Sequence, residues 1–108
     1  MATIDDFAKL DIRIVTVREA SPLEGSEKLV KLTVDIGEGE TRQILAGIGK
    51  SYDANTLVGR QLVAIVNLET RKMMGEESQG MILATGDDIE NITLLQPEKE
   101  VTSGGRIR

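Results

Sequence analysis

The chain has 108 residues, of which 40% are hydrophobic and 2% aromatic, and its net charge is −5. This length suits one compact domain and excludes a catalytic domain joined to a separate cofactor domain. The chain has no Cys and no His, which excludes disulfides, thiolate zinc sites and acid–base chemistry by imidazole.

The first half of the chain predicts a short helix followed by three strands. Thr3 and Asp6 have the spacing of a weak capping box, which would open a helix that runs through Lys9. Strands are expected over residues 11–19, 29–36 and 41–46, separated by a loop at 21–26 and a turn at 37–40. The second strand has the clearest pattern, because apolar and polar residues alternate from Val30 to Ile36.

The second half predicts another short helix, two strands and an extension. The helix is expected over residues 51–58, with Ser51 as its cap and Gly59 as its stop. Strands over residues 61–67 and 80–84 complete an order that is typical of the OB-fold, a small Greek-key barrel. We therefore expect a single all-β domain over residues 1–108, with a five-stranded OB-fold barrel over about residues 11–85. A short helix would lie between strands 3 and 4, a second short helix at the N-terminus, and a C-terminal β extension over about residues 86–108.

The predicted extension carries apolar residues that a five-stranded barrel does not need, namely Ile89, Ile92, Leu94, Leu95 and Val101. Two-fold pairing of this segment in a homodimer would bury these side chains, because most homo-oligomers are symmetric. The alternative is that the tail folds back onto its own barrel. The sequence favours a dimer that uses the tail, together with the N-terminal helix.

Residues 67–81 form a polar loop between two expected strands, and this loop contains an adjacent pair of cations. Arg71 and Lys72 are adjacent there, and Gly75 and Gly80 permit backbone turns. Asn67 and Ser78 supply short hydrogen-bonding side chains. A loop fixed between core strands is a good place for binding, and on an acidic protein any basic site for nucleic acid must be local. The other interpretation is a solvated hairpin with an ordinary charge pair.

No set of residues in the chain predicts an enzyme, a cofactor or a metal site. The stretch Gly49, Lys50, Ser51 lacks the earlier glycine of a phosphate-binding loop, because position 44 is Ile44. The adjacent carboxylates lack the ligand spacing of a calcium loop. Since Phe7 and Tyr52 are the only aromatic residues, single-stranded binding by base stacking is disfavoured. A folded RNA, read by its backbone and shape, fits better.

Several separate motifs together resemble one known family. They are the run from Phe7 to Arg13, the residues from Glu27 to Leu29 and from Thr33 to Gly37, the run from Ile44 to Ile48, and the positions Gly59, Arg60, Asn67, Leu68, Arg71, Lys72, Met73, Gly75, Ser78, Gln79, Gly80 and Met81. This pattern resembles the tRNA-binding OB-fold domain of methionyl-tRNA synthetases and of the endothelial-monocyte-activating-polypeptide type. The family often has Pro at the position of Thr70 and Arg at the position of Met74, so the loop here carries less charge.

The resemblance implies a module that binds tRNA by its folded shape and raises the affinity of a synthetase for tRNA. By match, Asn67, Lys72, Met73, Ser78 and Met81 belong to the tRNA-contacting loop, with Arg71 as a neighbouring cation. Lys28, Lys31 and Arg42 would add phosphate contacts across the face of the barrel. Related free-standing and bacterial C-terminal domains form homodimers through segments beyond the barrel.

We therefore expect a free-standing, dimeric tRNA-binding protein that serves as a non-catalytic accessory (beta) subunit of methionyl-tRNA synthetase. Met1 directly precedes the domain, which favours a separate protein over a fragment of a fusion. Without a signal peptide or a membrane-length apolar run, we expect a cytoplasmic location and no membrane partner. The alternative is a protein-binding module that resembles a secretion chaperone of the same fold; the loop motif favours RNA.

Overall fold

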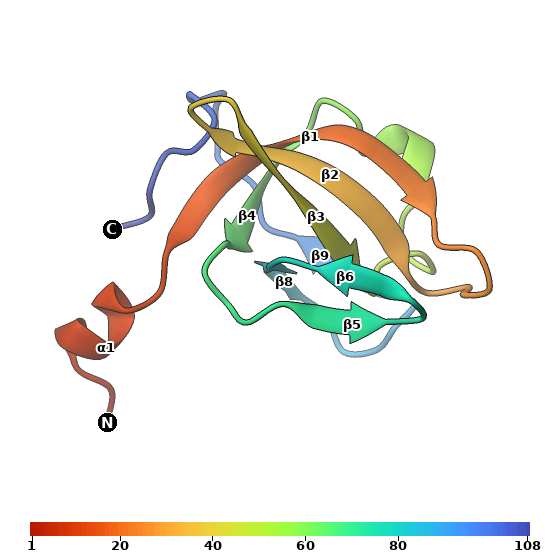
Figure 1. Ribbon diagram of the computed structural model, residues 1–108, viewed down its shortest axis with the longest axis horizontal. Helices are drawn as coiled ribbons and strands as arrows, with labels where there is room; N and C mark the ends of the chain where they lie inside the picture. The colour runs from red at the N-terminus through yellow and green to blue at the C-terminus, as the bar shows by residue number, and fades with distance from the viewer.

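The computed structural model describes residues 1–108 as a curled antiparallel sheet in the strand order β3-β2-β1-β4-β7 (Figure 1). Its strands are β1 (Ile12–Pro22), β2 (Val30–Gly37), β3 (Glu40–Ala46), β4 (Gln61–Ile65) and β7 (Met81–Ile82). Two small ribbons accompany it, one of β5 (Arg71–Met73) with β6 (Glu76–Ser78) and one of β8 (Ala84–Thr85) with β9 (Thr93–Leu94). The predicted all-β, OB-like fold is confirmed.

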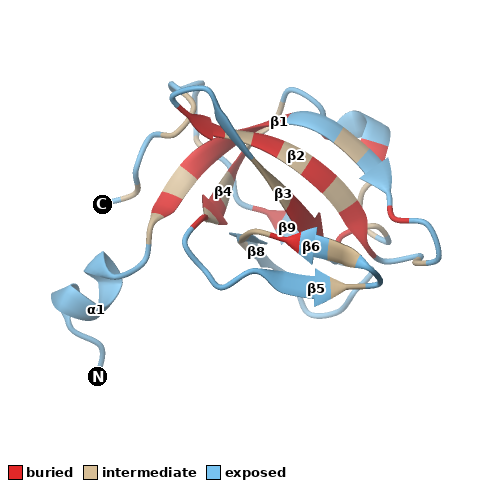
Figure 2. Ribbon diagram, viewed as in Figure 1, coloured by how far each residue is buried: buried red, intermediate tan, exposed pale blue.

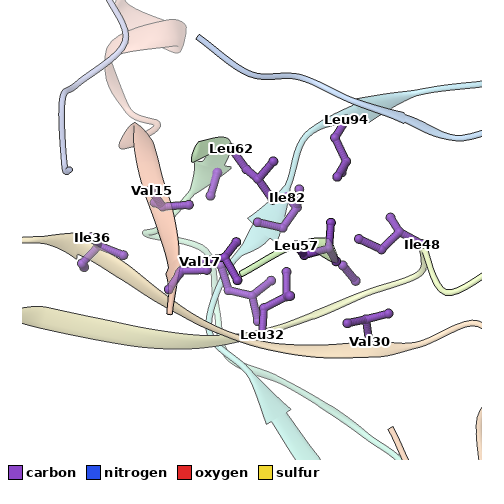
Figure 3. Close-up of a cluster of buried hydrophobic side chains, with 14 of the residues drawn as sticks. Val15, Val17, Val30, Leu32, Ile36, Ile48, Leu57, Leu62, Ile82 and Leu94 are labelled. Carbon is purple, nitrogen blue, oxygen red and sulfur yellow. The ribbon is translucent and has the colours of Figure 1, made fainter. Parts of the chain in front are cut away.

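The core lies inside the curl of this sheet and is almost entirely aliphatic. On β2 every second residue from Val30 to Ile36 is buried, as the alternation predicted (Figure 2). These side chains pack against buried side chains of β1, β3 and β4. Ile82 of β7 and Leu94 of β9 also belong to this core (Figure 3). The only aromatic residue that contacts this interior is Tyr52, which is partly buried and packs against it.

β1 is long enough to pair with two neighbouring strands. Its first part, Ile12 to Thr16, pairs with β4, and its second part, Thr16 to Pro22, pairs with β2 across a bulge after Val17. The strand therefore bends from one half of the barrel into the other, as bulges allow. It extends to Pro22, three residues beyond the predicted end at residue 19.

Both predicted helices are present, but the second is shorter than expected. α1 (Ile4–Ala8) begins with the predicted capping box of Thr3 and Asp6, buries no residue and projects away from the barrel (Figure 1). The 3-10 helix η1 (Ala54–Thr56) is capped by Asp53, not by Ser51. The Ser51 hydroxyl instead donates to the Ile89 carbonyl and accepts from the Ile92 N–H. No helix has the length and hydrophobicity that crossing a bilayer requires.

The C-terminal tail folds back onto its own barrel. The expectation that a second copy of the chain buries all of its apolar residues is therefore wrong. Leu94 is only 6% exposed and belongs to the core, and Ile92 packs against that core. Further along, Gly104 and Gly105 bond to the backbone of Ile14, on the edge of β1 that β2 leaves free. A Cβ on Gly104 would lie 2.6 Å from the Ile36 carbonyl oxygen, so only glycine fits this crossing.

Candidate nucleic-acid interface

The predicted loop between strands contains a short hairpin, β5–β6. Its turn residues Met74 and Gly75 both have positive φ, 52° and 83°, as a two-residue type I′ turn requires. Strand alternation places Arg71 and Met73 on one face and Lys72 on the other. Lys72 stands directly opposite Glu77 in the ladder, so the outward face of the hairpin carries one charge of each sign.

The inner face of the hairpin is held against β3 by polar side chains. The Ser78 hydroxyl accepts from the Leu45 N–H at 3.0 Å and donates to the Gly80 carbonyl at 3.1 Å. Ser78 is only 2% exposed. Its two hydrogen bonds are therefore internal, and the one from Leu45 joins β3 to β6.

Two glutamines and one glutamate extend this closure. The Gln43 side chain donates to Glu76 at 3.1 Å and to the Glu77 carbonyl at 2.8 Å. The Gln79 side chain accepts from the Gln43 backbone N–H at 3.0 Å, and the Gln79 backbone N–H donates to the Gln43 carbonyl. Neither Gln43 nor Glu76 was predicted from the sequence, because their partners lie more than 30 residues away.

The hairpin also packs on the loop between β1 and β2. Met73 contacts a small apolar cluster of Leu23, Leu29 and Leu45. The Met74 methyl lies 3.2 Å from where a Cβ on Gly25 would stand. Polar bonds on one side and apolar contacts on the other fix the hairpin, so its cations have defined positions.

Carboxylates already pair with part of the predicted basic set. The Lys31 ammonium lies 3.4 Å from Glu76, and the Arg42 guanidinium lies 3.1 Å from Glu40. By contrast, Lys28, Arg71 and Lys72 are exposed and form no ion pair. The predicted cations that form no ion pair are therefore Lys28 and the two hairpin residues, of which Lys72 faces Glu77 across the ladder.

Asn67 has a structural position at the base of the hairpin loop. Its side-chain oxygen accepts from the Asp11 N–H and its amide nitrogen donates to the Lys9 carbonyl, both at 2.8 Å. The Asp11 carboxylate in turn binds Arg13, and this hydrogen bond lowers the pKa of Asp11. Asn67 thus joins the end of the N-terminal arm to the end of β4.

An apolar pocket of about 300 Å³ opens beside the hairpin. Its lining includes buried residues at the end of β3 and on β7, together with Met73 and Met81. Arg71 is the only charged residue that lines it. Three of the nine predicted residues, Arg71, Met73 and Met81, therefore meet at one place. Lys28 directly precedes the lining residue Leu29, whereas Lys72 does not line the pocket.

Comparisons with known proteins show the family of the chain. The family model described as "Putative tRNA binding domain" matches residues 12–106. The methionine–tRNA ligase of Methanococcoides burtonii is 50% identical over 104 residues, which are 96% of this chain and 15% of that protein. The corresponding enzyme of Deinococcus radiodurans is 46% identical over 108 residues, 100% of this chain and 16% of that protein. The chain thus spans about one-sixth of the length of these curated relatives.

Two solved structures match along nearly their whole length. A MetRS related protein from Pyrococcus horikoshii superposes with a TM-score of 0.91 at 31% identity, covering 100% of this chain and 98% of that chain. The chaperone CsaA from Bacillus anthracis gives a TM-score of 0.91 at 34% identity, covering 100% and 99%. Since the family model covers most of the residues and the fold agrees, the chain belongs to the putative tRNA-binding domain family.

Proposed function

We propose that this chain binds folded tRNA through the β5–β6 hairpin and the adjoining face of β2 and β3. The observation that carries the proposal is the group of exposed, unpaired cations, Lys28, Arg71 and Lys72, on a protein of net charge −5. Cations without a carboxylate partner can bind phosphates without breaking an ion pair. The predicted contacts of Lys31 and Arg42 would have to compete with Glu76 and Glu40.

The proposed role is that of a non-catalytic, cytoplasmic accessory (beta) subunit that raises the affinity of methionyl-tRNA synthetase for tRNA. The methionine–tRNA ligase relatives support the partner. The MetRS related protein, of which the chain covers 98%, supports a free-standing form. The likeness to a chaperone CsaA gives the second candidate, a protein-binding module, which the apolar pocket would also serve.

A homodimer remains part of the proposal, with an interface that uses the C-terminal tail together with the N-terminal helix. α1 buries no residue and leaves Ile4 78% exposed and Phe7 39% exposed. Leu95 and Val101 of the tail are also exposed, at 41% and 38%. Sedimentation of the intact chain tests this point: a monomer at micromolar concentration would end the dimer proposal.

Titration of labelled tRNA at several salt concentrations tests the proposed function. Each phosphate contact releases counterions, so removing one cation from the interface should lower the salt slope by about one unit. We expect Arg71→Ala and Lys72→Ala each to weaken binding, and the double variant to weaken it further. Lys99→Ala is the matched control, since Lys99 is an exposed, unpaired cation outside the hairpin.

Folding should be unaffected by these exposed substitutions, and circular dichroism checks this. Wild-type affinity in the double variant would mean that the hairpin is only a solvated charge pair. Tighter binding to an unfolded polypeptide than to tRNA would favour the chaperone-like alternative.

A further inference from the structure

The pocket beside the hairpin combines features that a charged surface alone does not need. Its lining includes Leu45, Ala46, Ile48 and Ile82, each less than 9% exposed. Met81, which lines it, is 49% exposed. Phosphate binding would make no use of this apolar volume of about 300 Å³, which is at the small end of ligand-binding cavities.

Two polar features define what the pocket can hold. Gly47 lines it, is exposed, and neither its N–H nor its carbonyl makes a hydrogen bond within the protein. The Arg71 guanidinium also lines it and makes only a 3.8 Å contact with the Met73 sulfur. The pocket therefore offers one free donor, one free acceptor and one free cation around an apolar interior.

These groups complement a nucleotide better than an aliphatic side chain. A nucleobase has apolar faces and an edge with donors and acceptors, and its backbone carries a phosphate. Methionine sulfur makes favourable contacts with aromatic rings, and an arginine plane stacks on bases. A leucine side chain would fill the interior but leave the Gly47 groups and the Arg71 charge unused.

We propose that this pocket accepts one unstacked nucleobase of the bound RNA, between Met73 and Met81, with Arg71 on the adjoining phosphate. The inference rests on the proposed function and adds to it a reason for preferring folded RNA with loops. Bases in a continuous A-form helix are stacked and paired, whereas loops present bases that can be splayed out. On a chain with almost no aromatic residues, methionine takes the place of the aromatic stacking platform.

The four methionines, Met1, Met73, Met74 and Met81, make a direct test possible. The intact protein is labelled with ¹³C at the methionine methyl groups and titrated with an unmodified tRNA transcript. A base stacked in the pocket should shift the Met73 and Met81 methyl signals upfield by its ring current. Met1 serves as the internal control because it lies in the exposed N-terminal arm. A fully paired RNA duplex of similar length should bind without this shift.

A pair of truncations gives an independent readout. Met81→Ala removes one side of the pocket, and Val58→Ala is its control, because Val58 is a similarly exposed apolar residue (53%) that does not line the pocket. Contact between a methionine sulfur and an aromatic ring is worth roughly a two- to tenfold change in affinity. We expect Met81→Ala to weaken tRNA binding by roughly that factor and duplex binding hardly at all. Val58→Ala should change neither.

The outcomes separate this inference from the proposed function. Salt-sensitive tRNA binding with unshifted Met73 and Met81 signals would overturn the base pocket and leave tRNA binding intact. Absence of tRNA binding would overturn both. Movement of the same two signals with an unfolded polypeptide, and not with tRNA, would assign the pocket to protein binding and overturn the inference.

Discussion

Removing the Ser78 hydroxyl should lower the stability of the fold and should not remove a direct contact with RNA. Ser78→Ala would leave the buried Leu45 N–H without its acceptor and the Gly80 carbonyl without its donor. A buried group that loses its partner costs about 1–3 kcal/mol. For a domain of about 100 residues, each kcal/mol lowers the melting temperature by roughly 4–8 °C. We therefore expect a fall of about 10 °C, from a loss near 2 kcal/mol.

Thermal unfolding followed by circular dichroism measures this loss. Ser21→Ala is the matched control, because Ser21 is an exposed serine whose hydroxyl makes no hydrogen bond in the protein. We then compare tRNA affinities at a temperature where Ser78→Ala and Arg71→Ala are both folded. We expect Ser78→Ala to lower the affinity less than Arg71→Ala does. Unchanged stability with a large loss of tRNA affinity would refute this reasoning and would return Ser78 to the role that the family resemblance implies.

Two further predictions concern the structure around the site. The hydrogen bond from Arg18 lowers the pKa of Asp35, so this carboxylate stabilises the fold above the unfolded pKa of about 3.9, and the contribution is lost as the pH falls through the folded pKa. Asp35→Asn should therefore lower the melting temperature at pH 7. Between pH 7 and pH 3, the melting temperature of the variant should fall less than that of the wild type, and an equal fall in the two proteins would contradict this. Asn67→Ala should speed hydrogen exchange of the Asp11 amide, which loses its acceptor, while exchange in β2 stays unchanged. Unchanged exchange at Asp11 would mean that another group holds the N-terminal arm.

The parts of the fold that the sequence could predict are those with local causes. The alternation from Val30 to Ile36 follows from one buried face, and the capping box of Thr3 and Asp6 lies within one helical turn. Ser51 shows the opposite case. It has a suitable type and position for a helix cap, but its hydroxyl bonds to Ile89 and Ile92 near the end of the chain. No local pattern could reveal partners 38 and 41 residues away.

The loop that carries the candidate site could be predicted from the sequence, but the structural roles of its residues could not. The loop motif identified the hairpin, and Arg71, Lys72 and Lys28 are indeed exposed. The same motif grouped Asn67 and Ser78 with them, although both side chains make hydrogen bonds within the protein. A sequence motif does not distinguish a residue that shapes a binding loop from one that contacts the ligand. The tRNA contacts of all nine residues stay predictions until binding is measured.

The neighbouring residues Leu94 and Leu95 allow the two explanations of the apolar tail to be separated. Leu94 is 6% exposed and packs in the core, whereas Leu95 is 41% exposed. Truncating a buried leucine costs about 2–5 kcal/mol, because it removes apolar contacts and leaves a cavity.

We therefore expect Leu94→Ala to lower the free energy of unfolding by about that amount and Leu95→Ala to change it little in the monomer. If Leu95 lies in a dimer interface, Leu95→Ala should raise the dimer dissociation constant measured by sedimentation while the fold stays intact. Equal, small effects of both substitutions on unfolding would show that the tail does not complete the barrel in solution. A chain ending after Thr85 cannot make this distinction, because it would remove Leu94 from the core together with any interface.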